Sequence, residues 1–227
     1  MFSRHRYQLS ASNALFQLFS PIPTRPMKPI RKARIPVSKP TRFPAENVVA
    51  RWDVRHLAGH SEFEEYHFIN CDFSEADLSH KRFADCRFER CNLASARLAD
   101  TALQNVAFDD CKLLGLQFTA CRDMQFGVHF DLCQMRYASF AGRRMPHTHF
   151  VRCGLDEADF ADADLSGAVF RDCSLAGAVF QNTRLAAADF TSAIGFVIDP
   201  MTNPLLGARF SLHGLLGVVA KFGLVVE

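Results

Sequence analysis

The sequence predicts an all-β protein, a four-sided β-solenoid that ends in a short helix at the C-terminus. Three observations support this prediction. Large apolar residues recur every five positions, as in GLDEADFADADLSGAVF at 154–170. Phenylalanines and cysteines recur at intervals of twenty. Such fixed-period self-similarity is typical of solenoids, in which each unit buries its apolar face by stacking on its neighbours.

Two blocks of large apolar residues carry the interval of five. Neither an α-helix, with about 3.6 residues per turn, nor a strand, with a repeat of two, accounts for it. A small residue, most often Ala or Cys, stands two positions before most of the large ones, and we expect both to point inward. The first block is Phe63, Phe68, Phe73, Leu78, Phe83, Phe88, Leu93, Leu98, Leu103, Phe108, Leu113 and Phe118. The second is Phe130, Met135, Phe140, Met145, Phe150, Leu155, Phe160, Leu165, Phe170, Leu175, Phe180, Leu185 and Phe190.

The interval of twenty sets the size of one coil. Two sets of residues show it, each interrupted once: Phe68, Phe88, Phe108, Phe130, Phe150, Phe170 and Phe190, and Cys71, Cys91, Cys111, Cys133, Cys153 and Cys173. Four pentads therefore make one coil, with one pentad on each side. Coils stacked at the sheet spacing of about 4.8 Å can then hydrogen-bond to one another through their backbones.

The two blocks are out of phase by two residues. Phe118 and Phe130 are twelve residues apart, and Cys111 and Cys133 are 22 apart. A two-residue insertion in CRDMQFGV at 121–128 restores both series, so we expect a small loop on one side of a continuous solenoid. Loops on rigid scaffolds are common sites of function. The candidate residues of this loop are Asp123, Met124, Gln125 and Phe126.

Charge is divided unevenly along the chain. Residues 1–45 contain nine basic residues, no acidic ones and most of the prolines, which is typical of a disordered leader. Such a leader can contact nucleic acid or a membrane surface, or it can be merely solvated, and Met27 is an alternative start. The remaining chain has 17 Lys and Arg against 24 Asp and Glu, a net charge of −7. We expect an N-terminal cap at 46–62, the solenoid at 63–195 and a C-terminal cap with a helix at 196–227.

The residue types favour a binding protein over an enzyme. No apolar run of about 18 residues predicts a transmembrane helix, and no clear signal peptide is present, so we expect a cytoplasmic protein. All eight cysteines, including Cys86 and Cys121, occupy the small inward position, which indicates core residues and not disulfides or metal ligands. His147 and His149 complete no metal or acid–base motif. We therefore expect no cofactor and no catalytic residues.

The repeats CDFSEADLSHKRF (71–83), CNLASARL (91–98) and LDEADFADADLSGAVF resemble the pentapeptide repeat family, written A(D/N)LXX. The resemblance covers about 60–195 and implies a right-handed quadrilateral β-helix. FVIDPMTNPLLGARFSLHGLLGVVAKFGLVVE (196–227) resembles the tail of the Qnr-like, AlbG-like and MfpA-like branch, which supplies a cap and a dimerisation helix. We expect Ser211 to be the N-cap of this helix. Its apolar face is Leu212, Leu215, Leu216, Val219 and Phe222.

The resemblance also implies a function. Relatives of this branch bind type II topoisomerases by imitating duplex DNA, and so give tolerance to quinolones or to poisons such as albicidin. For this chain it implies DNA gyrase or topoisomerase IV as partner and a homodimer, without membrane association and without nucleic-acid binding by the acidic body. Two features depart from the branch: the large projecting loops of Qnr proteins are missing, and His213 stands where a proline is often found.

The candidate DNA-like surface is an acidic run that we place on two adjoining sides of one coil. A net charge of −7 is well below the roughly 18 charges of duplex DNA over a rod of about 30 Å. Mimicry would therefore depend on clustering, with Arg143, Arg144 and Arg152 kept off this face. The alternatives are a solvated face that keeps the rod soluble and a rigid scaffold for another protein partner. The acidic residues are Asp156, Glu157, Asp159, Asp162 and Asp164.

Overall fold

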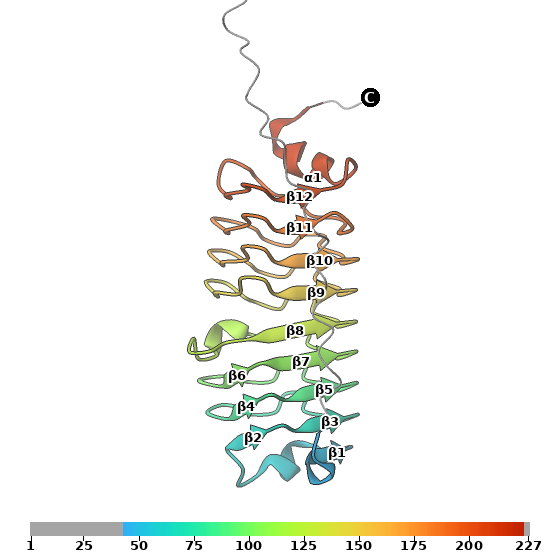
Figure 1. The fold of residues 1–227 in the computed structure, drawn as a ribbon, viewed down its shortest axis with the longest axis vertical. Coiled ribbons are helices and arrows are strands. Elements are labelled where there is room, and N and C mark those ends of the chain that lie inside the picture. Colours follow the sequence, from blue (N-terminus) through green and yellow to red (C-terminus); the bar gives the residue numbers. More distant parts are fainter. Residues whose placement is uncertain (1–42, 225–227) are drawn as a thin grey trace, which may run out of the picture. The chain divides into compact units, whose positions relative to one another are not determined.

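Residues 43–224, which the computed structural model describes, form a parallel β-solenoid closed at one end by a short helix (Figure 1). The fold class predicted from the interval of five is confirmed. Most of the proposed leader, residues 1–42, lies outside the described residues, as do residues 225–227. None of the helices in the described part is long and apolar enough to cross a membrane.

Each coil has four sides, which we number in chain order. Side 1 carries a three-stranded sheet of β2 (Glu62–Glu64), β4 (Arg82–Ala84) and β6 (Ala102–Gln104). Side 2 carries a nine-stranded sheet of β1 (Val48–Ala50), β3 (His67–Ile69), β5 (Arg87–Glu89), β7 (Val106–Asp109), β8 (Val128–Asp131), β9 (His149–Val151), β10 (Val169–Arg171), β11 (Asp189–Phe190) and β12 (Arg209–Phe210). On sides 3 and 4, isolated parallel bridges link successive coils. Examples are Asp72 with Asn92 on side 3 and Asp159 with Val179 on side 4. The nine-stranded sheet extends beyond both ends of the range 63–195.

The register of side 2 confirms the interval of twenty and its single interruption. Phe88 pairs with Phe108, whereas Phe108 pairs with Phe130, which is 22 residues later. The interval returns to twenty between Phe130 and Phe150. The two extra residues lie outside the sheet, in the loop that follows η3 (Phe118–Ala120). The solenoid is therefore continuous across the irregularity, as predicted.

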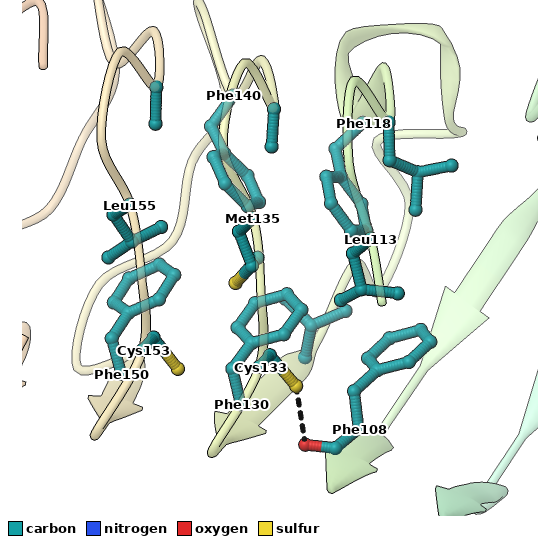
Figure 2. Close-up of a cluster of buried hydrophobic side chains, with 14 of the residues drawn as sticks. Phe108, Leu113, Phe118, Phe130, Cys133, Met135, Phe140, Phe150, Cys153 and Leu155 are labelled. Atoms are coloured by element: carbon teal, nitrogen blue, oxygen red, sulfur yellow. Dashed lines mark hydrogen bonds between the residues drawn. The ribbon is translucent and has the colours of Figure 1, made fainter. Parts of the chain in front are cut away.

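Stacked phenylalanine rings fill the core of the solenoid (Figure 2). Rings one coil apart lie almost parallel: the centroids of Phe130 and Phe150 are 5.3 Å apart and their planes differ by 8°. Rings on neighbouring sides meet edge to face, as Phe130 and Phe140 do at 5.8 Å and 72°. Both arrangements are favourable, and burial of each side chain contributes about 1.5–3 kcal/mol. The stacked rings therefore link every coil to the next.

The small inward residues do more than leave room for these rings. The thiol of Cys111 donates a hydrogen bond to the carbonyl oxygen of Phe88 at 3.3 Å, and the hydroxyl of Thr183 donates to that of Phe160 at 2.8 Å. In each case the carbonyl belongs to the coil below. The eight cysteines are buried and free, which confirms their interpretation as core residues. Burial raises the pKa of the Cys86 thiol to about 12, so it stays protonated at neutral pH.

The corners of the coil use left-handed backbone two residues after the large apolar residue. Glu157, Asp162 and Asp172 have φ angles of 57°, 58° and 53°, and Gly167 has 69°. Glycine adopts this conformation without steric cost, and Asn and Asp tolerate it better than most residues. This requirement accounts for the frequent Asp, Asn and Gly at this position, which the five-residue pattern left unexplained.

The C-terminal end is closed by α1 (Leu215–Val219) and η4 (Ala220–Phe222). This helix is shorter than expected, because its N-cap is Gly214 and not Ser211. The hydroxyl of Ser211 instead accepts a hydrogen bond from the Gly214 amide at 2.9 Å, in the turn that precedes α1. At the opposite end, η1 (Ala45–Asn47) and η2 (Val54–Leu57) flank β1.

Candidate functional site

The histidines form no metal centre. The rings of His129 and His149 lie side by side on side 2, with centroids 6.3 Å apart. Burial lowers the pKa of His149, and the neighbouring His129 lowers it further. No group of three or more His, Cys, Asp and Glu residues within 43–224 is arranged to hold a metal ion. The candidate sites are therefore the exposed surfaces of the solenoid and its loop.

The acidic surface consists of Asp156, Glu157, Asp159, Asp162 and Asp164. Asp159 lies on side 4 and Asp164 on side 1, and Asp162 lies at the corner between these sides. Asp156 and Glu157 lie at the preceding corner, between sides 3 and 4. The surface therefore spans the two adjoining sides 4 and 1 and the corner before them.

The carboxylates of Asp156 and Asp159 are held in place by hydrogen bonds to backbone amides. The carboxylate of Asp156 accepts hydrogen bonds from the Ser174 hydroxyl and from the Ala176 amide, one coil further on. That of Asp159 accepts from the Ala161 amide at 2.9 Å. Their negative charges are therefore fixed in orientation and half-buried.

Asp164 lies beside arginines at the edge of side 1. It accepts hydrogen bonds from the amide and hydroxyl of Ser166 at 3.1 and 2.7 Å, and Arg184 lies 4.0 Å away. Burial alone would raise the pKa of Asp164, but these groups hold it below its ordinary value. Arg144 lines one shallow pocket with Asp162, Asp164, Asn182 and Arg184. Arg144 therefore lies on the acidic surface, and its backbone forms a bridge with that of Asp164 in the adjoining coil. The condition that Arg144 be kept off this face is not met.

The two most exposed acids of this surface differ in their surroundings. Glu157 forms an ion pair with Arg136 and accepts a hydrogen bond from the Tyr137 hydroxyl at 3.2 Å. The Arg136 guanidinium lies 4.8 Å from the centre of the Tyr137 ring. Asp162, by contrast, has no side-chain hydrogen bond or ion pair within 43–224. Its charge is therefore the freest of the five to act on a partner.

The loop at 121–127 presents a mixed surface. Asp123 and Met124 are 93% and 76% exposed, and Gln125 is also exposed. Phe126 instead points inward and meets the ring of Phe118 edge to face, with centroids 6.4 Å apart. Three of the four predicted loop residues are therefore available to a partner, and Phe126 anchors the loop to the core.

Arg143 has a role that the sequence analysis did not assign to it. Its side chain is only 4% exposed and lies beneath the loop, off the acidic surface. Its guanidinium donates hydrogen bonds to the carbonyl oxygens of Cys121 and Arg122 at 2.9 and 2.7 Å, and to the Asp123 carboxylate at 2.7 Å. It also lies 4.2 Å from the centre of the Phe126 ring. The sequence held a signal, because Arg143 stands at an inward position that usually holds a small residue.

Arg152 lies away from the acidic surface, at the corner between sides 2 and 3. Its guanidinium pairs with the carboxylate of Asp131 at 2.7 Å. Arg143 and Arg152 are therefore kept off the acidic surface, whereas Arg144 is not.

The residues predicted to mediate dimerisation form an exposed apolar end. The four most exposed are Leu212, Leu215, Leu216 and Phe222, at 88%, 43%, 41% and 50%. Val219 is half-buried. The side chain by which α1 packs on the solenoid is Val218, which is 9% exposed.

Comparison with known families identifies the repeats. A family model described as a pentapeptide repeat region matches residues 61–140. A second, described as pentapeptide repeats (8 copies), matches residues 133–172 and 168–194. A comparison with curated proteins gives no significant match.

Several solved structures are similar to this chain. Full-length QnrB1, a plasmid-mediated fluoroquinolone resistance protein, has 18% identity and a TM-score of 0.47, covering 78% of this chain and 97% of its own. HetL, a pentapeptide repeat protein involved in heterocyst differentiation regulation from the cyanobacterium Nostoc sp. strain PCC 7120, has 18% identity and a TM-score of 0.25, with coverages of 70% and 92%. Rfr23 from the cyanobacterium Cyanothece 51142 has 16% identity and a TM-score of 0.22, with coverages of 47% and 88%.

Proposed function

The chain belongs to the pentapeptide repeat family, and from this premise we propose that it acts by binding a protein and not by catalysis. The partner is DNA gyrase or topoisomerase IV, bound where duplex DNA would lie and thereby protected from quinolone- or albicidin-type inhibitors. The resemblance of the tail at 196–227 to the Qnr-like branch supports this partner. The proposal implies a cytoplasmic protein.

The observation that carries the proposal is the acidic surface. Residues 43–224 contain 23 acidic and 17 basic side chains, so the solenoid is negative as a whole. Four of the five carboxylates, all but that of Asp162, accept hydrogen bonds within 43–224. Charges held in place on a rigid scaffold lose little freedom on binding, and they attract a basic DNA-binding surface from a distance.

A supercoiling assay tests the proposal. Purified protein is titrated into gyrase reactions that contain a quinolone or albicidin, and the concentration for half-maximal protection is measured. Asp162→Asn removes an exposed charge without breaking an internal bond. We expect it to raise that concentration about fivefold, because a screened charge pair contributes about 1 kcal/mol.

Asp172→Asn is the matched control for Asp162→Asn. Asp172 occupies the same left-handed corner position, with φ of 53°, but lies at the corner between sides 2 and 3. Asp172→Asn should leave the protection of gyrase unchanged. If the wild-type protein at micromolar concentration alters neither supercoiling nor drug sensitivity, the proposed function is wrong.

A second candidate is a rigid scaffold for another protein partner. Arg144 and Arg184 lie among the acids of side 1, so this surface carries both signs of charge. The two candidates predict opposite effects for the same substitution. Arg144→Ala makes the surface more negative, which should strengthen binding by a DNA mimic. It should weaken binding to a partner that recognises the mixed pattern, and unchanged or weaker protection of gyrase would therefore count against DNA mimicry by this surface.

We also propose that two chains associate through the exposed apolar residues of the C-terminal end. Leu212, Leu215, Leu216, Val219 and Phe222 together form an apolar surface at the end of the solenoid. A second copy would cover it and would double the length of the negative rod. Such a symmetric contact is the commonest route to a homodimer.

A further inference from the structure

One column of inward positions on side 1 is unusual. In regular coils it holds small side chains such as Thr101, Ala163 and Thr183, all of them fully buried. In the coil above the loop it holds Arg143, which is 4% exposed and whose Nε atom has no hydrogen-bond partner. A buried guanidinium is costly unless its surroundings compensate it. The compensation comes from the loop at 121–127.

The same column holds long polar side chains next to two other irregular segments. The ammonium group of Lys81 donates to the carbonyl oxygens of Leu57 and His60, at 3.2 and 2.6 Å, in the turn after η2. The amide of Asn203 donates to the carbonyl oxygen of Asp199 at 2.9 Å, in the turn before the last coil. A long polar donor thus stands beside each of these three irregular segments and donates to its carbonyl oxygens.

We propose that Arg143 is a positioning residue, which fixes the loop at 121–127 in one conformation and so presents Asp123 and Met124 as a preformed part of the partner-binding surface. The identity of that partner rests on the proposed function, whereas the fixing of the loop does not. Two carbonyls, one carboxylate and one aromatic ring converge on the guanidinium from successive loop residues. A planar cation with several donors suits such a set of acceptors better than any other side chain.

Amide hydrogen exchange tests the fixing of the loop. Arg143→Met keeps an unbranched apolar stem but leaves the carbonyls of Cys121 and Arg122 without their donor. Exchange at residues 122–127 should become about 10- to 100-fold faster, the factor expected when hydrogen bonds to a charged group are lost. Arg143→Lys should restore part of the protection, because an ammonium group can reach some of the acceptors but not all.

The control is Arg144→Met, which changes an exposed neighbour that has no hydrogen bond or ion pair to the loop within 43–224. It should leave loop exchange unchanged, and strands β9 and β10 should keep their protection in all three variants. No change at 122–127 in Arg143→Met would overturn the proposal. An equal rise in β9 and β10 would overturn it too, because Arg143 would then support the whole fold.

The protection assay with gyrase tests the link to the partner. Arg143→Met should raise the concentration for half-maximal protection several-fold, and Arg143→Lys should restore part of the loss, in parallel with loop exchange. If the loop loosens and protection is unchanged, the loop is not part of the partner-binding surface. If the wild-type protein protects no topoisomerase, the proposed function fails, and hydrogen exchange alone decides whether Arg143 fixes the loop.

Discussion

The thiol of Cys133 donates a hydrogen bond to the carbonyl oxygen of Phe108, 3.3 Å away in the coil below (Figure 2). The same bond joins Cys91 to Phe68 at 3.3 Å. The bonded carbonyl is buried, and a buried carbonyl without a donor is destabilising. The inward position next to each large residue therefore favours a side chain that is both small and a donor, which cysteine and threonine provide.

Substitutions of Cys133 separate size from hydrogen bonding. Cys133→Ala should cost about 1 kcal/mol of unfolding free energy, because the Phe108 carbonyl loses a weak donor. Cys133→Ser keeps a donor of similar size and should cost less. Cys133→Leu should cost about 1–3 kcal/mol or more, because the packed core has no room for it. Urea unfolding measures the free energy of unfolding of all three variants. A Cys133→Leu variant as stable as the wild type would contradict this account of the core.

The coil and its interruption could be predicted because the sequence spacing directly reflects stacking. Residues twenty apart lie above one another, so the shift from Phe108 to Phe130 in the register is visible as 22 residues in the sequence. The same rule reaches part of the acidic surface, since Asp156 accepts a hydrogen bond from the amide of Ala176, twenty residues later. Once the coil length is known, the residues that lie above one another in successive coils can therefore be identified from the sequence.

The position of Arg143 could not be predicted from hydropathy, which assigns a charged residue to the surface. Its burial depends on where the loop carbonyls point, and the two extra residues of the loop have no repeat from which their path can be inferred. The partners of Glu157 depend on side-chain conformations at Arg136 and Tyr137, which no spacing encodes. The placement of the acids on two adjoining sides, in contrast, follows from counting pentads across the corner at Asp162.

Stability should fall between pH 7 and pH 5 because of His149. Burial lowers its pKa, and His129, Arg171 and His147 lower it further. The unfolded chain, with a histidine pKa of about 6.5, then binds more protons than the folded one, so this contribution is present above pH 6.5 and is lost as the pH falls through the folded pKa. Asp100, whose pKa is held at about 2 by Arg122, titrates below this window.

His149→Gln should flatten this part of the pH profile. The free energy of unfolding is measured in urea at several values between pH 7.5 and pH 5 for both proteins. The variant should lose less stability on acidification than the wild type. If both proteins lose the same stability on acidification, His149 takes up no additional proton on unfolding.

The C-terminal surface should determine the oligomeric state. Leu216→Arg places a charge in the middle of the proposed interface and should weaken association at least about 100-fold, since an unpaired buried charge costs several kcal/mol. Sedimentation velocity would then show monomer at concentrations where the wild type is a dimer. Ile194→Arg is the control, because Ile194 is also apolar and is 62% exposed but lies on side 3. A wild-type monomer, or a dimer unaffected by Leu216→Arg, would refute this interface.

Gly217 should be required for α1 to dock on the solenoid. A Cβ atom at this position would lie 2.2 Å from the carbonyl oxygen of Phe196 and 3.1 Å from its ring. The Gly217 carbonyl also accepts a hydrogen bond from the Ile198 amide at 3.1 Å, which holds the two backbones together. Because the obstacle is backbone and not a mobile side chain, Gly217→Ala can be accommodated only if the helix moves away.

Two opposing effects meet in Gly217→Ala, and their magnitudes predict the outcome. Alanine favours the helix by about 1 kcal/mol over glycine, whereas overpacking costs about 1–3 kcal/mol and a backbone clash lies at the upper end of that range. Docking should therefore be lost: amide exchange at 212–222 should rise and dimers should dissociate, while strands such as β9 keep their protection. Gly223→Ala is the control, because Gly223 has φ of 62° with nothing within 4 Å of its Cβ position, so only conformational strain is added. If Gly217→Ala instead slows exchange in α1, helix propensity outweighs the clash and the close approach to Phe196 does not hold the helix in place.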